Sequence, residues 1–119
     1  MDKLTIYHNP RCSKSRQTLK LIQEEGGEPH VVLYLETPPT ISELTDILEK
    51  LGMAAADLLR TNEADYKAHF PAAEQLDEAE LIKLMVRHPK VIERPIVVTK
   101  DKAVIGRPPE AVLKLFSAG

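Results

Sequence analysis

The chain has 119 residues, 43% of them hydrophobic and 29% charged, and its formal net charge at pH 7 is -2. That length suffices for one domain with its own hydrophobic core, and the composition excludes extended disorder. The slightly acidic balance argues against a large nonspecific nucleic-acid surface. The sequence contains no apolar run of the length that a signal peptide or a membrane span needs, so we expect a cytoplasmic protein that binds neither nucleic acid nor membrane.

The first third of the chain has the pattern of a βαβ unit. A strand is predicted at residues 3–7, a helix from residue 13 or 15 to about residue 25, and a second strand at residues 30–34. Gly26 and Gly27 end the helix. Because strand, helix and strand follow one another within roughly thirty residues, we expect the two strands to be parallel.

The middle of the chain, at about residues 40–90, is predicted to be entirely helical, and we interpret it as an insertion into a sheet-based scaffold. Thr40-Ile41-Ser42-Glu43 has the form of a capping box, and Gly52 ends the helix that this box begins. Further helices are predicted at residues 54–59, around residues 63–67, and from about residue 77 to a point before Pro89.

The last part of the chain returns to strands. Residues 96–99 and 103–105 are predicted to form an antiparallel hairpin, and a final helix runs from Pro108-Pro109 to Phe116. The element order is then β-α-β, helices, β-β-α. We therefore predict a single α/β domain over residues 1–119, with a mixed β-sheet and a helical insertion.

Cys12 is the only cysteine, and it follows His8-Asn9-Pro10-Arg11 at the junction of the first strand and the first helix. Unpaired N–H groups and the positive end of the helix dipole favour an anion there, which lowers the pKa of a thiol. A lone cysteine often only fills a core. The polar and charged neighbours of Cys12 favour the reactive interpretation. The chain cannot form an internal disulfide or a Cys-x-x-Cys pair, because Ser15 stands at the fourth position, which fits a reducing compartment.

Arginines at element boundaries are candidates for binding an oxyanion. Arg94 and Arg107 flank the predicted hairpin, so their positions lie at the same edge of the sheet, and each precedes a proline. A guanidinium offers a planar fork of donors that suits a tetrahedral oxyanion. For any single arginine a surface ion pair is the more common role, and Arg60, after a short helix, is the candidate with the least support from spacing.

Three polar residues near Cys12 are candidate supporting groups. His8 can help to ionise a thiol, or it can simply end the first strand. Ser15 can donate a hydrogen bond to the thiolate, or it can serve as a helix-start residue. Asn9 precedes the nucleophile in the same loop. The other histidines are scattered, and none has metal-ligand spacing with a cysteine, so no metal site is expected.

Four separated motifs together resemble the glutaredoxin-linked arsenate reductases over essentially the whole chain. The resemblance implies a thioredoxin-like fold, a thiol–arsenate adduct on Cys12, and binding of the arsenic oxyanion by Arg60, Arg94 and Arg107. It further implies that His8 and Ser15 favour the thiolate, that external glutathione attacks the adduct, and that glutaredoxin regenerates the thiol. We expect a monomer without a bound cofactor. The motifs are His8-Asn9-Pro10-Arg11-Cys12 with Ser15-Arg16, Leu58-Leu59-Arg60-Thr61-Asn62-Glu63, Ile92-Glu93-Arg94-Pro95-Ile96, and Ile105-Gly106-Arg107-Pro108-Pro109.

Ser13-Lys14 stands where the best-characterised branch of that family usually has Gly-Thr, a pattern similar to a sister branch. Two alternatives therefore remain beside arsenate reduction. One is a glutathione-dependent thiol oxidoreductase that acts on another substrate. The other is a redox-sensing transcription regulator resembling the Spx-like proteins, which share the fold; those proteins usually carry Cys-x-x-Cys, which this chain lacks.

Overall fold

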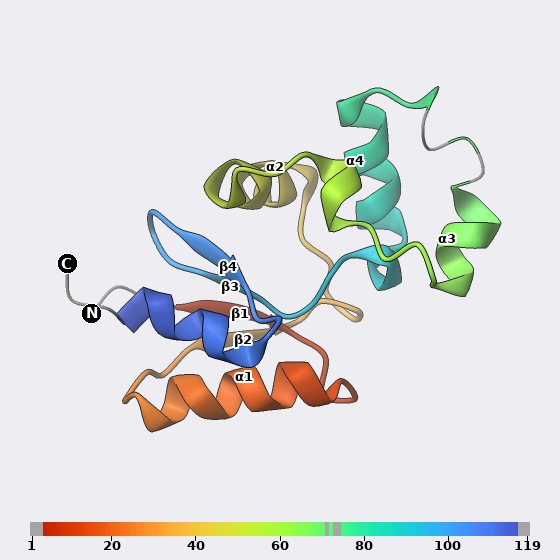
Figure 1. The fold of residues 1–119 in the computed structure, drawn as a ribbon. Coiled ribbons are helices and arrows are strands. Elements are labelled where there is room, and N and C mark those ends of the chain that lie inside the picture. Colours follow the sequence, from red (N-terminus) through yellow and green to blue (C-terminus); the bar gives the residue numbers. More distant parts are fainter. Residues whose placement is uncertain (1–3, 71, 73–74, 117–119) are drawn as a thin grey trace. The chain divides into compact units, whose positions relative to one another are not determined.

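The structure is a computed structural model that describes residues 4–70, 72 and 75–116 (Figure 1). The chain divides into two compact units, one made of Met1–Thr37 with Arg94–Gly119 and the other of Pro38–Glu93. In the described part of the chain, no helix combines the length and the apolar character that crossing a membrane demands. The elements of the first unit are β1 (Thr5–His8), α1 (Ser13–Glu24), β2 (His30–Leu33), β3 (Ile96–Val98), β4 (Ala103–Ile105) and the 3₁₀ helix η4 (Pro109–Phe116).

The first unit contains a four-stranded mixed sheet in the order β2-β1-β3-β4. β1 and β2 are parallel, with His8 opposite Leu33, as the βαβ pattern predicts. β3 is antiparallel to both β1 and β4, so the predicted hairpin is also confirmed. The α/β class with a mixed sheet is therefore correct, and both β1 and β2 end at one edge of the sheet.

One hydrophobic core joins this sheet to the helices of the first unit. α1 packs beside η4, shown in orange and blue in Figure 1. Completely burying an aliphatic side chain such as Ile22 stabilises the fold by about 1.5–3 kcal/mol relative to exposing it. The buried members of this core are Leu4, Ile6, Ile22, Val97 and Val112.

The regular elements that the structure describes in the second unit are all helical, as predicted. α2 (Ile41–Leu51) begins with the expected capping box, in which the Thr40 hydroxyl accepts a hydrogen bond from the Glu43 N–H at 3.0 Å. The Glu43 carboxylate accepts the Thr40 N–H at 2.8 Å in return, and Gly52 ends the helix in the left-handed region at φ 67°. The other elements described in this unit are η1 (Ala55–Leu58), α3 (Ala64–His69), α4 (Glu78–Arg87) and η3 (Pro89–Val91).

One detail near the sheet edge differs from the sequence-based prediction. β2 ends at Leu33, one residue earlier than predicted, because the chain turns there and Leu33 O accepts the N–H groups of Glu36 and Thr37. Tyr34 therefore leaves the strand and is buried at 1% exposure. The Arg94–Pro95 and Arg107–Pro108 peptide bonds are both cis.

Candidate active site

Cys12 lies between β1 and α1 and is the N-cap residue of the helix. A tight turn brings it there, since its N–H donates to Asn9 O at 3.0 Å, and its own carbonyl accepts the N–H of Arg16 at 3.0 Å. Its thiol is free and half-buried, at the end of α1 where the first backbone N–H groups have no partner within the helix. The first N–H groups of α1 are therefore available to the sulfur.

A buried polar network holds the loop that carries Cys12. The Ser15 hydroxyl lies 2.6 Å from Nδ1 of His8, and it accepts the N–H of Asn9 at 3.1 Å. The Asn9 side-chain oxygen accepts the N–H of Arg11 at 3.0 Å. Ser15 is completely buried, so these contacts replace hydration that the hydroxyl and its partners have lost. The network ties the end of β1 to the first turn of α1.

The protonation state of His8 follows from its surroundings. Burial, and then the positive charge of Arg16, lower the pKa of His8 below its ordinary value of 6.5. The imidazole is therefore neutral at pH 7. Because Ser15 Oγ already accepts the Asn9 N–H, its own proton is free to donate to Nδ1 of a neutral ring. His8 thus positions the loop and does not place a cation beside the thiolate.

The two ends of the β3–β4 hairpin bring Arg94 and Arg107 to Cys12. Gly106 N–H donates to Pro95 O at 2.9 Å, which pairs the chain on either side of the hairpin. Nε of Arg107 donates to Arg94 O at 2.8 Å, and its Nη2 lies 3.6 Å from Cys12 Sγ. Arg94 also hydrogen-bonds the thiol through its side chain. Two guanidinium groups that are distant from Cys12 in sequence therefore meet at one sulfur atom.

Gly106, the residue before Arg107, packs closely against α1. Thr18 is completely buried, and its hydroxyl donates to Lys14 O at 2.8 Å and lies 3.4 Å from Gly106 O. A Cβ on Gly106 would meet the Thr18 side chain and come within 2.8 Å of Pro95 Cγ. A side chain at position 106 would therefore force a neighbour to shift.

The surroundings of Cys12 lower the pKa of its thiol below the ordinary value of 9.0. Burial is the largest single influence and raises the pKa. A hydrogen bond from the backbone N–H of Ser15, one from the Arg94 side chain, one from the N–H of Lys14, and the charge of Arg94 lower it, and together they outweigh burial. The sequence left two roles open for Ser15, a hydroxyl donor to the thiolate or a helix-start residue. In the structure the Ser15 backbone N–H bonds the sulfur, because His8 and Asn9 occupy the hydroxyl.

Tyr34 is a residue of this site that the sequence-based interpretation missed. Burial lowers the pKa of Arg94, but interactions with the Cys12 thiol and with the nearby Tyr34 side chain outweigh this and raise it. The only sign of this in the sequence is that Tyr34 ends the strand predicted beside β1. A tyrosine at that position fits a core residue equally well.

Arg60 belongs to the second unit, and its contacts are made inside that unit. Its Nη1 lies 2.9 Å from a Glu93 carboxylate oxygen, and its Nε lies 3.4 Å from Glu63. Its backbone N–H donates to Val91 O at 2.6 Å, next to the bridge between Leu59 and Ile92. Two carboxylates therefore flank the guanidinium, and the part that Arg60 takes in an anion site stays a prediction.

Comparison with known proteins relates this chain to a protein family. The sequence model of the ArsC family matches residues 7–115. The chain belongs to the ArsC family. It is 55% identical to the protein named uncharacterized protein YfgD of Escherichia coli K12, over 95% of this chain and 96% of that protein. It is 45% identical to a protein named arsenate reductase of Neisseria meningitidis, over 94% and 97% of the two chains.

The structure named arsenate reductase from Vibrio cholerae superimposes on this ArsC-family chain with a TM-score of 0.89. The two chains are 45% identical, and the match covers 95% of this chain and 97% of the other. The predicted thioredoxin-like fold and the resemblance to the arsenate reductases are therefore confirmed.

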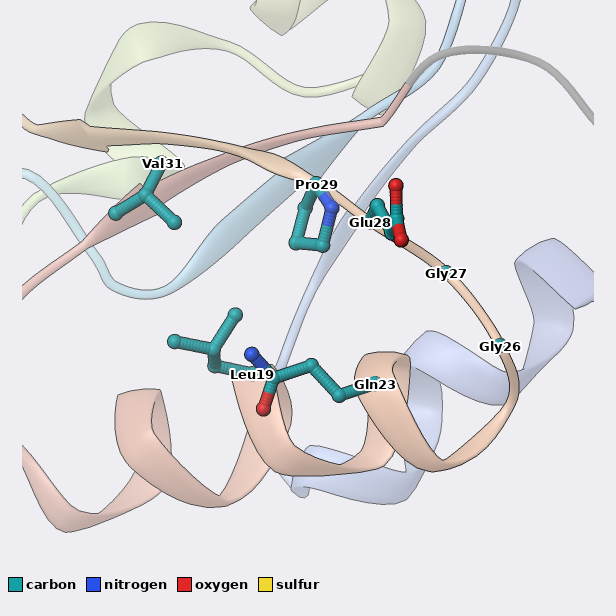
Figure 2. A pocket seen from close by; sticks show the side chains of 7 residues that line it. All are labelled: Leu19, Gln23, Gly26, Gly27, Glu28, Pro29 and Val31. Atoms are coloured by element: carbon teal, nitrogen blue, oxygen red, sulfur yellow. The ribbon is translucent and has the colours of Figure 1, made fainter.

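A hollow of about 440 Å³ in this ArsC-family protein lies apart from Cys12 (Figure 2). It is formed by the second half of α1 and the segment that leads into β2, and Gln23 is about 16 Å along the helix axis from Cys12. It is therefore not part of the thiol site. Within the described ranges, no group of three or more His, Cys, Asp or Glu side chains could hold a metal ion. The residues that line the hollow are Leu19, Gln23, Gly26, Gly27, Glu28, Pro29 and Val31.

Proposed function

We propose that this ArsC-family protein is an arsenate reductase in which the Cys12 thiolate attacks arsenic and an external thiol system supplies the electrons. The observation that carries the proposal is the meeting of Arg94 and Arg107 at the sulfur. A thiolate and an oxyanion repel each other, so an attack needs positive charge at the point where the two meet. The names of the Neisseria and Vibrio relatives support arsenate as that oxyanion.

The first step is a substitution at As(V) without a change of oxidation state. The Cys12 sulfur forms an S–As bond, and one oxygen leaves as water: Cys–SH and H₂AsO₄⁻ give Cys–S–AsO₃H⁻ and H₂O. The lowered pKa of the thiol makes the attacking sulfur available at neutral pH. Donors from the two guanidinium groups neutralise the charge on the arsenate oxygens as the bond forms.

The second step is the reduction, and it needs a thiol from outside the chain because the chain contains one cysteine. Glutathione attacks Cys12 sulfur, the S–As electron pair stays on arsenic, and the products are a Cys12–glutathione disulfide and arsenite, H₂AsO₃⁻. Glutaredoxin thiol then attacks the glutathione sulfur of this disulfide and releases Cys12 as the free thiol. Each turnover thus oxidises two external thiols and reduces one As(V) to As(III).

Arsenite production with glutathione and glutaredoxin tests the proposal. The native protein should turn over arsenate, Cys12→Ser should not, and Ser13→Ala, an adjacent exposed change, should retain most of the activity. Intact-mass measurement should show a glutathionyl group on the native chain only when arsenate is present. Equal arsenite production by the native protein and Cys12→Ser would contradict the proposal.

A second candidate is a glutathione-dependent thiol oxidoreductase that acts on a different substrate. Ser13 and Lys14, exposed residues of the first turn of α1 beside Cys12, differ from the Gly-Thr pair of the best-characterised branch. This candidate predicts a Cys12–glutathione disulfide that forms from oxidised glutathione, without arsenate and without arsenite production. The same intact-mass experiment therefore separates the two candidates.

A further inference from the structure

Two histidine rings stack face to face at the end of the short helix α3. His69 is the last residue of α3 and His88 directly follows α4, and their ring centroids lie 3.9 Å apart with an interplanar angle of 6°. Both helices, green and teal in Figure 1, belong to the second unit. We call this pair the histidine stack. It joins the end of one helix to the end of another and has no part in the reaction proposed above.

α3 depends on contacts at its end, because none of its 6 residues is buried. A helix of this length is unstable on its own in water. Phe70, which follows α3 and is buried, stacks on Tyr66 at 5.5 Å and contacts the edge of His88 at 6.1 Å. The backbone of His88 is fixed, since its N–H donates to Leu84 O at 2.9 Å and its carbonyl accepts the Val91 N–H at 3.1 Å. If the histidine stack separates, α3 is therefore the element that moves.

The charges around the histidine stack make it sensitive to acid. Two imidazoles at this distance can stack as neutral rings or with one proton, but two imidazolium ions repel each other. Burial and then the charge of His69 lower the pKa of His88 below its ordinary value of 6.5, while Asp65 raises it and Arg87 lowers it. The other charged residues of α3 and η3 are exposed: Lys67 and Lys90. Because the folded-state pKa of His88 lies below the unfolded one, the contribution of the stack to stability is complete above pH 6.5 and is lost as the pH falls through the folded-state pKa.

We propose that the histidine stack is an acid-sensitive contact that holds α3 in place near neutral pH and releases it when both rings are protonated. The release reaches the other end of α3, because Glu63 is its N-cap residue and the Glu63 carboxylate lies 3.4 Å from Arg60 Nε. Glu93, the second carboxylate beside Arg60, lies outside α3. Protonation of the histidine stack thus changes the surroundings of Arg60 by loosening one of its two ion pairs.

Hydrogen exchange measured by NMR tests the proposal without any substrate. In the native protein, the protection factors of the Lys67 and Phe70 amides, corrected for the intrinsic effect of pH, should fall about tenfold between about pH 7.5 and about pH 5, since a pKa difference of one unit corresponds to a factor of ten. His69→Gln removes one of the two charges, so its protection should fall less than about twofold over the same range. His30→Gln, at an exposed position of β2, is the matched control and should behave like the native protein.

The pKa of His88, measured from its ring-proton shifts, completes the test. It should lie below 6.5 in the native protein and rise toward 6.5 in His69→Gln, and the loss of α3 protection should have the same midpoint. An unchanged pKa of His88 in His69→Gln, or an equal loss of protection in the native protein and the variant, would overturn the proposal. If His69→Gln leaves α3 unprotected at both pH values, the native protein decides: coincident midpoints support the proposal, and a loss of protection that does not follow the His88 titration overturns it.

Discussion

Replacing Ser15 by alanine should destabilise the fold more than it alters the thiol. Ser15 is completely buried, and its hydroxyl contacts Nδ1 of His8 at 2.6 Å and the N–H of Asn9 at 3.1 Å. The alanine variant leaves two buried polar groups without that partner, at about 1–3 kcal/mol each. We therefore expect the free energy of unfolding to fall by about 2–6 kcal/mol. The thiol pKa should stay within about half a unit of the native value, because alanine keeps the backbone N–H that bonds the sulfur.

Urea unfolding measures the first quantity, and the pH dependence of iodoacetamide alkylation measures the second. Ser13→Ala, at an exposed position in the same helix turn, is the control, and it should change stability by no more than about 0.5 kcal/mol. A Ser15→Ala protein that is as stable as the native one but has a clearly raised thiol pKa would refute the reasoning. That result would mean that the hydroxyl itself stabilises the thiolate.

Two further changes are predicted. The thiol of Cys12 has a folded-state pKa below its unfolded value near 9.0, so its contribution to stability is present above the unfolded pKa and is lost as the pH falls through the folded one. The difference in unfolding free energy between the native protein and Cys12→Ser should therefore grow as pH rises toward 9.0, and a difference that is flat with pH would contradict this. Thr40→Ala should cost about 1 kcal/mol in urea unfolding because it removes the cap that bonds the Glu43 N–H, whereas Thr45→Ala, within α2, should cost less; equal losses would argue against the cap.

The parts of the fold that follow from local patterns were predictable from the sequence. The parallel β1–β2 pair follows from two strands joined by a helix, and the β3–β4 hairpin follows from two short apolar runs around a polar turn. The approach of Arg94 to Arg107 was predictable for the same reason, since a hairpin brings its own ends together. Local pairing rules therefore predict which strands pair and which chain ends meet at the edge of the sheet.

The contacts that depend on side-chain competition were not predictable. Ser15 has several partners within reach, and only the packed structure shows that His8 and Asn9 occupy its hydroxyl while its N–H serves the sulfur. Tyr34 was assigned to a strand, because nothing in the sequence marks the turn that begins at Leu33. Sequence patterns set the register of strands but not the choice among nearby hydrogen-bond partners.

The position of the cysteine at the start of α1 has a consequence for the design of this protein. Serine, threonine, aspartate or asparagine at a helix N-cap stabilises the helix by about 1 kcal/mol over residues that cannot cap, and the sulfur of Cys12, the N-cap residue of α1, is a weaker acceptor than their oxygens. The N–H groups of Lys14 and Ser15 lower the pKa of the thiol at this position instead of bonding a strong capping oxygen. A better capping residue at position 12 would therefore stabilise α1 but remove the reactive thiol. A redesign that selected only for thermal stability would replace Cys12.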